Sequence, residues 1–247
     1  MATRSLAYPR IGCIRLGRVP RVVLAVDGDR PAILRQARRA GVDLLEARVD
    51  QFHRLDVAAV AQQTARLKRY GLPLIGTVRS RLEGGAAALS DAQRQRLYAQ
   101  VIPLVDAVDV DLRSPSLMRA VMRASRKVHA TMILSYHNFH TTPSTSVLER
   151  MVQRARHLGA DLIKIATMAR KEDDVVRLLE LTLIHRRQRL VTIAMGTQGS
   201  ISRLIFPLAG SLLTYTHYTP SYGQLPLKEL VTFLRRYSPA FAAAHPG

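Results

Sequence analysis

The first candidate for chemistry is a lysine inside an apolar segment. Lys164 lies in the apolar run 162–166, whereas the other four lysines fall in segments typical of surface helices or loops. Burial there disfavours the ammonium form, and a neutral amine can attack a ketone to form a Schiff base. Arginine could not serve, because its guanidinium stays protonated in proteins. The alternative interpretation is a lysine that extends out of the strand end or pairs with Asp109 or Glu46. The segment alone leaves both interpretations open.

The second candidate is His137, which follows the apolar run 131–136. An imidazole at a strand end that faces the same opening as Lys164 can move protons near neutral pH. An isolated histidine is more often structural or simply exposed. His137 taken by itself therefore supports either interpretation.

A third element joins an arginine to an acid and two glycines. Thr77-Val78-Arg79 ends an apolar run, and Glu83-Gly84-Gly85 follows it closely. An arginine at a strand end can bind a carboxylate or hydroxyls, and a glycine pair lets a loop approach a ligand closely. The alternative is an ordinary loop between a strand and a helix.

The fourth element is the segment 195–203, in which Gly196 and Gly199 precede serines that open a short helix. Such a loop offers backbone N–H groups to an anion, with Arg203 as the counter-charge. The alternative is routine capping of the helix N-terminus by Ser200. An arginine in the first turn opposes the helix dipole, and an anionic ligand between them would explain its position.

Alternating strand and helix patterns must position these residues. Segments with helical spacing of apolar residues cover 32–40, 57–70, 91–102, 145–158, 173–185 and 225–237. Between them lie short apolar runs at 22–26, 44–49, 72–78, 107–112, 130–135, 162–166, 190–194 and 212–216. Eight such units in 247 residues predict a single (β/α)₈ TIM barrel over residues 1–247.

Polar side chains at the strand ends favour the barrel over an open doubly wound sheet. Glu46, Arg48 and Asp50 alternate with apolar residues and so share one face of their strand. Charges near the C-terminal end of a strand are costly in a packed core but normal where a barrel opens. No glycine-rich nucleotide motif follows the first strand. The same pattern recurs at Thr77, Arg79, Asp109, Asp111, Ser135, His137 and Lys164.

The N-terminal segment and the composition limit the compartment and the binding partners that we expect. The first 25 residues contain no acid, and prolines and glycines interrupt any long helix there, so we predict a short N-terminal strand or hairpin, with a targeting peptide as the lesser alternative. The single cysteine, Cys13, excludes an internal disulfide and suits a reducing cytoplasm. No apolar run approaches the roughly 20 residues that cross a bilayer, so no membrane partner is expected.

The net charge of +19 attracts anions of any kind. The positive residues are spread along the predicted helices without a dense run, and only 5% of residues are aromatic. Stacking platforms for nucleic-acid bases are therefore scarce. We interpret the charge as arginine-rich solvated helix faces and expect no nucleic-acid partner.

Taken together, these elements resemble the type I 3-dehydroquinate dehydratases over nearly the whole chain, from about Val22 to Tyr237. No single motif decides the matter, but seven occur in the family's order. They are Glu46-Ala47-Arg48-Val49-Asp50, Thr77-Val78-Arg79 with Glu83-Gly84-Gly85, Val108-Asp109-Val110-Asp111-Leu112, Ser135-Tyr136-His137-Asn138-Phe139 with Thr142-Pro143, Lys164-Ile165-Ala166, Ser202-Arg203 with Gly210-Ser211, and Gly223-Gln224.

The resemblance implies a (β/α)₈ barrel, commonly a homodimer, that uses neither metal nor cofactor. It implies dehydration of 3-dehydroquinate to 3-dehydroshikimate in the shikimate pathway of aromatic amino-acid biosynthesis. Lys164 would form an imine with the C3 ketone, His137 would take the C2 proton and return one to the departing C1 hydroxyl, and Glu83 would orient His137.

The resemblance also implies the residues that hold the substrate. Asp109 would support the substrate-binding residues from behind. The binding residues would be Glu46, Arg48 and Arg79 for the ring hydroxyls, and Arg203, Ser221 and Gln224 for the carboxylate side and the closing loop.

Three positions depart from the family pattern. Pro220 takes the place of the loop serine, with Ser221 one step along. Ala25 stands where many members have a serine on the first strand, and Asn138 replaces a frequent aspartate beside His137. These changes predict weaker substrate binding with the catalytic pair retained.

Two other functions remain as alternatives. A class I aldolase would also use a lysine on the sixth strand of a barrel, although the His137 and Arg203 elements favour dehydration. A basic, non-catalytic barrel that binds nucleic acid would show a salt-sensitive affinity and no turnover.

Overall fold

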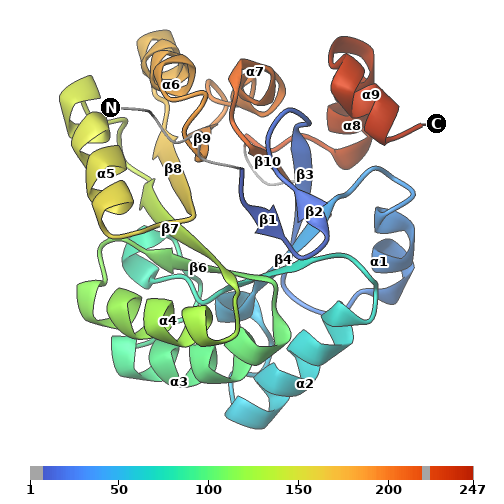
Figure 1. The fold of residues 1–247 in the computed structure, drawn as a ribbon, viewed down its shortest axis with the longest axis vertical. Coiled ribbons are helices and arrows are strands. Elements are labelled where there is room, and N and C mark those ends of the chain that lie inside the picture. The colour runs from blue at the N-terminus through green and yellow to red at the C-terminus, as the bar shows by residue number, and fades with distance from the viewer. Residues whose placement is uncertain (1–7, 219–222, 247) are drawn as a thin grey trace.

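Eight parallel strands form the centre of the molecule, and helices surround them (Figure 1). The computed structural model describes residues 8–218 and 223–246. The sheet order is β10-β3-β4-β5-β6-β7-β8-β9, so neighbours in the sequence are neighbours in space. The strands are β3 (Arg21–Val26), β4 (Leu44–Arg48), β5 (Leu74–Thr77), β6 (Ala107–Asp111), β7 (Thr131–Asn138), β8 (Leu162–Met168), β9 (Leu190–Met195) and β10 (Leu213–His217).

The ring closes between β9 and β10 without a regular ladder in the described part of the chain. The backbone N–H of Leu212 donates to the carbonyl of Leu190 at 3.0 Å, and that of Thr192 donates to the Ser211 hydroxyl at 3.1 Å. The (β/α)₈ barrel predicted from the sequence is confirmed.

Helices cover the outside of the barrel, and side chains cap the N-termini of some of them. Asp56 caps α2, and Ser90 with Gln93 forms a capping box on α3. The sequence analysis named no helix between 112 and 130, where α4 begins with Pro115. The helices are α1 (Pro31–Ala37), α2 (Val57–Lys68), α3 (Asp91–Val101), α4 (Pro115–Lys127), α5 (Thr145–His157), α6 (Glu172–Ile184), α7 (Ser202–Ala209), α8 (Leu227–Tyr237) and α9 (Pro239–Ala244), with 3₁₀ turns η1 (Val49–Gln51), η2 (Arg81–Glu83) and η3 (Ile102–Leu104).

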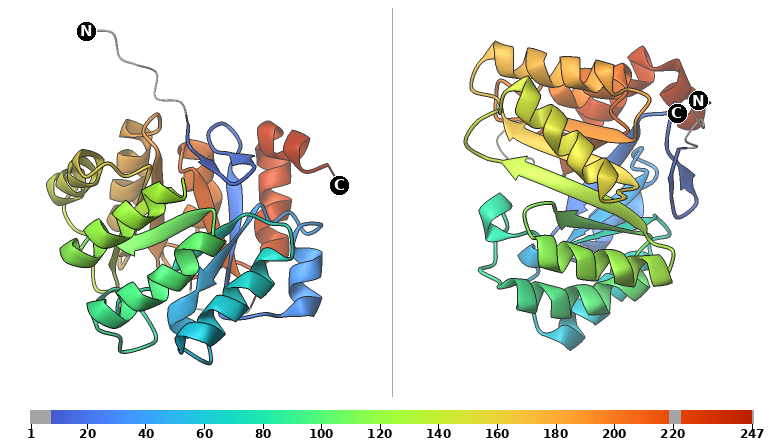
Figure 2. Two further views of the ribbon diagram at one scale, coloured as in Figure 1. Left: turned by 60° about the horizontal axis from the view of Figure 1, so that its bottom comes forward. Right: turned by 60° about the vertical axis from the view of Figure 1, so that its left-hand side comes forward.

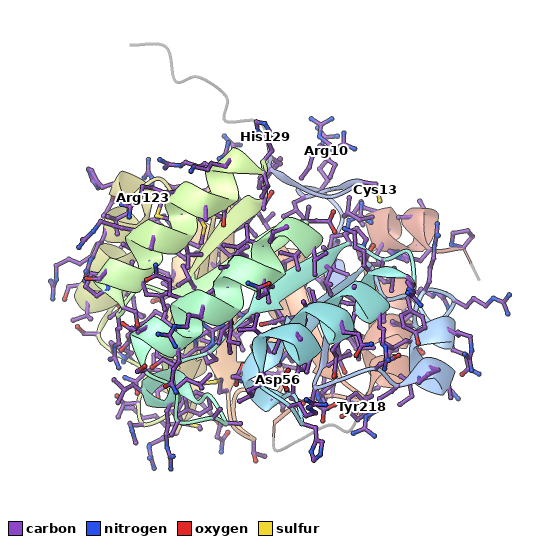
Figure 3. All side chains as sticks on the ribbon, turned by 90° about the horizontal axis from the view of Figure 1, so that it is seen from below. Arg10, Cys13, Asp56, Arg123, His129 and Tyr218 are labelled. Carbon is purple, nitrogen blue, oxygen red and sulfur yellow. The ribbon has the colours of Figure 1, made fainter. Side chains whose placement is uncertain are left out.

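The predicted N-terminal hairpin closes one end of the barrel (Figure 2). It consists of β1 (Arg10–Ile11) and β2 (Ile14–Arg15), paired antiparallel. Ile11 and Leu16 are buried against the first inward-facing residues of the strands. In Figure 3, Arg10 and Cys13 of this hairpin lie at one end of the molecule, and Asp56 and Tyr218 lie at the other.

The structure corrects one assignment near β4. The strand ends at Arg48, and Asp50 lies in the turn η1 rather than on the strand face shared by Glu46 and Arg48. Its buried carboxylate accepts hydrogen bonds from Arg48 and from the backbone N–H groups of Arg79 and Ala86. Asp50 therefore joins three segments beneath the mouth of the barrel, which is the end formed by the C-terminal ends of the strands.

Within residues 8–218 and 223–246, none of the helices combines the length and the apolar character that crossing a bilayer requires.

Candidate active site

A cavity of about 540 Å³ opens at the mouth of the barrel. Eight of the nine site residues predicted from the sequence line it, although they come from separate strands, loops and a helix. Ser221 and Pro220 lie outside the described residues. The eight are Glu46, Arg48, Arg79, Glu83, His137, Lys164, Arg203 and Gln224.

Lys164 is buried on β8, with its amine inside the cavity. Its Nζ donates to Asp109 Oδ2 at 3.1 Å and lies 3.4 Å from Glu46 Oε2. The sequence analysis treated burial in an apolar strand and pairing with these acids as alternatives. Both hold, because Ile163 and Ile165 pack outward in the core while the inward-facing amine of Lys164 meets carboxylates.

A chain of charges beneath Lys164 explains how the barrel tolerates so many buried ions. The guanidinium of Arg79 pairs with Asp109 at 2.9 Å and also contacts Asp111. Ser135 donates to Asp109 at 2.5 Å. Burial opposes ionisation of Asp109, but Arg79 and Lys164 outweigh that effect and hold its pKa well below the usual range. The network keeps Arg79 engaged with acids and fixes a negative charge beside the amine.

His137 and Glu83 form a second pair on the cavity wall, and His137 lies on β7, the strand that pairs with the Lys164 strand β8. Glu83 Oε2 accepts from the backbone N–H of His137 at 2.8 Å and lies 3.1 Å from its Nδ1. Burial, together with the positive charges of Arg79 and Lys164, holds the pKa of His137 well below its usual value. The imidazole is therefore neutral at neutral pH, with Nδ1–H directed to the carboxylate and Nε2 left to act as a base.

Glu83 itself is set to titrate near neutrality. Burial, reinforced by the nearby charge of Asp111, raises its pKa from 4.5 to about 7. Its other oxygen, Oε1, is buried without a hydrogen-bond partner in the part of the chain that the structure describes. The Glu83–His137 pair can therefore hold or release a proton in the physiological range.

The glycine pair after Glu83 allows close packing of the loop, and Gly84 lines the cavity. Gly84 has φ of 84°, and a Cβ there would meet the Phe139 ring at 2.3 Å. A Cβ on Gly85 would meet the carbonyl oxygen of Arg79 at 2.3 Å. Glycine thus allows the turn η2 to fold tightly and bring Glu83 to His137.

Arg203, in the first turn of α7, is a buried cation that lines the cavity. One terminal nitrogen donates to the carbonyl of Ala194 at 2.9 Å, while Nε is buried without a partner among the described residues. Burial lowers the pKa of Arg203 to about 10, so the group is charged at neutral pH. The suggested capping by Ser200 is wrong, because α7 begins at Ser202 and the Ser200 hydroxyl donates to Thr197. A charged guanidinium in this setting fits an anionic ligand group.

Two departures from the family pattern have visible consequences. Ala25 lines the cavity and offers no polar atom there. The side-chain oxygen of Asn138 accepts from the backbone N–H groups of His140 and Thr141, at 2.9 and 3.1 Å. Asn138 thus shapes the loop after β7 and makes no hydrogen bond to the imidazole of His137.

Several residues of the cavity wall were not predicted from the sequence, above all Tyr215 and His217 on β10. Both line the cavity, as does Asp27. The signal was present, because Tyr215 and His217 alternate with threonines along the strand and therefore share its inward face.

Three ligand atoms lie close enough to suggest a metal, those of Glu83, Asp111 and His137. Both oxygens of Asp111 are occupied, one by Arg79 and the other by Arg94 and the backbone N–H of Ser80. A cation would have to displace two buried guanidinium groups. This cluster fits an ion-pair network and not a metal centre.

The fold and the cavity define a (β/α)₈-barrel enzyme with a buried lysine and a neutral histidine in one pocket. A family model described as Type I 3-dehydroquinase matches residues 22–238. The chain belongs to the type I 3-dehydroquinase family, and the predicted resemblance is confirmed.

Individual relatives agree with this assignment. The 3-dehydroquinate dehydratase of Thermodesulfovibrio yellowstonii is 34% identical over 218 residues, which cover 87% of this chain and 95% of the relative. The type I 3-dehydroquinate dehydratase of Clostridium difficile, solved with covalently modified comenic acid, has a TM-score of 0.85 at 30% identity, covering 92% of this chain and 96% of that one. The Geobacillus kaustophilus 3-dehydroquinate dehydratase has a TM-score of 0.84 at 30% identity, covering 93% and 97%.

Proposed function

We propose that this enzyme is a hydro-lyase that converts 3-dehydroquinate to 3-dehydroshikimate in the shikimate pathway, through an imine on Lys164. The observation that carries the proposal is the placement of Lys164 and His137 on the wall of one cavity, within a member of the type I 3-dehydroquinase family. Family membership favours dehydration over the aldolase alternative.

The first step forms the imine. Lys164 passes a proton to Asp109 or Glu46, and its neutral amine attacks the C3 ketone. The ketone oxygen then leaves as water with the protons held by the amine and the carboxylate, which leaves a protonated imine. The cationic imine withdraws electrons from the neighbouring carbon and acidifies the C2 proton.

The second step is elimination. Neutral His137 removes the C2 proton through Nε2, while Glu83 holds Nδ1 and stabilises the imidazolium that forms. The same proton then passes to the departing C1 hydroxyl, which leaves as water. Hydrolysis of the product imine consumes the water released in the first step and restores the amine of Lys164.

Polar side chains that line the cavity would bind the substrate. Glu46, Arg48 and Arg79 line the cavity and would meet the ring hydroxyls, with Asp109 behind them. Arg203 would bind the carboxylate, since a half-satisfied buried guanidinium prefers an anion. Gln224 and Ser221 would complete the closing side of the site.

Two measurements test the proposal. Mixing the protein with 3-dehydroquinate should produce the ultraviolet absorbance of a conjugated enone. Borohydride added to the mixture should leave a reduced adduct on Lys164, and Lys164→Arg should give neither signal. An enzyme that is inert toward 3-dehydroquinate but trapped with a sugar phosphate would be an aldolase, and the proposal would fail.

We further propose a cytoplasmic homodimer. The single cysteine, Cys13, suits a reducing compartment. The outer face of α6 exposes Val176, Leu183 and Ile184 by 52%, 44% and 62%, which is unusually apolar for a solvated helix face. Sedimentation at micromolar concentration should give twice the chain mass of 27.5 kDa, and Val176→Glu should shift it toward the monomer.

A further inference from the structure

Strand β10 sends Tyr215 through the barrel interior to the amine of Lys164. The Nζ atom lies 4.0 Å from the centroid of the Tyr215 ring. The two side chains are 4% and 6% exposed, and both line the cavity. Lys164 belongs to β8, and β9 stands between it and β10 in the ring. The contact is therefore made inside the cavity and not between neighbours on one sheet face.

We propose that Tyr215 is a positioning residue whose ring face stabilises the cationic imine on Lys164. This inference rests on the proposed function and deepens it, because it assigns a role to a side chain that the reaction scheme leaves unused.

The Lys164 nitrogen loses N–H donors when it becomes an imine, and this loss explains why an aromatic ring is useful beside it. An ammonium has three N–H groups and can donate to both Asp109 and Glu46, as Lys164 does. A protonated imine keeps one N–H and can retain only one of these hydrogen bonds. An aromatic face attracts a cation through its quadrupole and requires no N–H, and the attraction is strongest where both groups are desolvated. The ring of Tyr215 thus keeps its contact as the hydrogen bonds of the amine are lost.

The hydroxyl of Tyr215 is not needed for this role of the ring. Its oxygen is buried and has no hydrogen-bond partner among the described residues. Burial and the charges of Glu46 and Asp109 hold the pKa of Tyr215 well above its usual value, so the ring remains a neutral phenol. Because the hydroxyl bonds to no group in residues 8–218 and 223–246, phenylalanine can replace tyrosine here without leaving a described partner unsatisfied.

The first test compares two variants at this position with a control elsewhere. Tyr215→Phe should keep kcat close to the wild-type value, whereas Tyr215→Leu should lower kcat by about 10- to 30-fold with a smaller change in KM. Phe241→Leu is the matched control, since Phe241 is a buried aromatic residue on α9 that stacks on His245 and does not line the cavity. The control should lose thermal stability and retain kcat.

A graded test separates electrostatics from packing. Phenylalanines with one, two and three fluorine atoms, incorporated at position 215, keep nearly the same shape but progressively cancel the negative potential of the ring face. We expect kcat, and the yield of the borohydride adduct on Lys164, to fall at each step. A role in packing alone would leave both unchanged.

Two results would overturn the inference while the wild type stays active. One is an equal kcat across the fluorinated series, and the other is a loss in Tyr215→Phe as large as that in Tyr215→Leu, which would assign the effect to the hydroxyl. A wild-type enzyme that does not dehydrate 3-dehydroquinate would instead overturn the proposed function. The two failures are therefore distinguishable.

Discussion

The two ends of the barrel are built from the same strands but have opposite chemistry. At the end closed by the hairpin, one inward residue from each strand is apolar: Val23, Leu44, Ile75, Ala107, Ile133, Leu162, Val191 and Leu213. Two positions further along each strand, about 7 Å away, the inward residues are Ala25, Glu46, Thr77, Asp109, Ser135, Lys164, Ile193 and Tyr215. Most of the second set is polar or ionisable.

Each strand therefore contributes one residue to a layer that stabilises the fold and another to a layer that carries out the chemistry. The apolar layer is completed by Ile11 and Leu16 from the hairpin, which are 0% and 2% exposed. The polar layer is held together by its own ion pairs, such as those of Lys164 and Arg79 with Asp109. Substitutions in the lower layer should therefore change the free energy of unfolding, and substitutions in the upper layer should change turnover.

Replacement of the amine should give the largest effect on turnover. Lys164→Arg keeps a positive charge beside Asp109 and Glu46, but a guanidinium cannot form the imine. We expect kcat to fall by about 10⁴-fold or more. Mass spectrometry after borohydride treatment should find no adduct. Turnover within about tenfold of the wild type would mean that the upper layer does not act through Lys164.

Removal of the imidazole should give the second largest effect, with a different signature. His137→Gln takes away the base but leaves the amine in place, so kcat should fall by about 10²- to 10⁴-fold. Borohydride should still trap a substrate adduct on Lys164. His185→Gln is the control, because His185 is equally buried but pairs with Glu149 on the outer helices. A His137 variant that neither turns over nor forms an adduct would contradict separate roles for the two residues.

The pH dependence of the His137–Glu83 pair gives a third test. Glu83 must be ionised to accept Nδ1–H, and its pKa is about 7, so kcat/KM should rise with pH through about 7. In Glu83→Gln we expect a rate about tenfold lower, with the acid limb moved to lower pH. The remaining group, His137, has a pKa well below its usual 6.5. An acid limb that does not move would exclude Glu83 as the titrating group.

The same substitution should also raise stability, so Glu83 is a mouth residue that affects both turnover and folding. Because the pKa of Glu83 is raised by folding, its contribution to stability is fully present below 4.5 and is lost as pH rises through about 7. The difference corresponds to about 3 kcal/mol for this largely buried group. Glu83→Gln should therefore be more stable than the wild type at pH 8 and similar at pH 4, as chemical denaturation can measure. Equal stability at both pH values would contradict the raised pKa.

Much of this two-layer architecture could be predicted from the sequence. The period-two pattern of a half-polar strand end placed Glu46, Arg79, His137 and Lys164 at one opening, because side chains two apart share a face. The eightfold recurrence of strand and helix then indicated the barrel.

The pairing of the charges could not be predicted in the same way. The contacts of Arg79 with Asp109 and Asp111 depend on the register between β5 and β6, which local patterns do not specify. Asp50 looked like a strand residue because the alternation continued into a 3₁₀ turn. The partner of Tyr215 lies across the cavity and 51 positions away along the chain, so only the closed ring reveals it.

The smallest effect on turnover should come from the apolar layer. Leu16→Ala removes a side chain that is 2% exposed beneath the strands, and we expect a loss of about 2–5 kcal/mol in the free energy of unfolding. Ile14→Ala, on the same hairpin but only partly buried, is the matched control and should lose less. Both variants should keep the wild-type kcat, because the catalytic groups lie in the layers further along the strands. Denaturant titration and steady-state kinetics on the same samples measure the two quantities. A Leu16 variant that remains folded but loses kcat would show that the two layers are coupled, since the hairpin would then help to hold the catalytic residues in place.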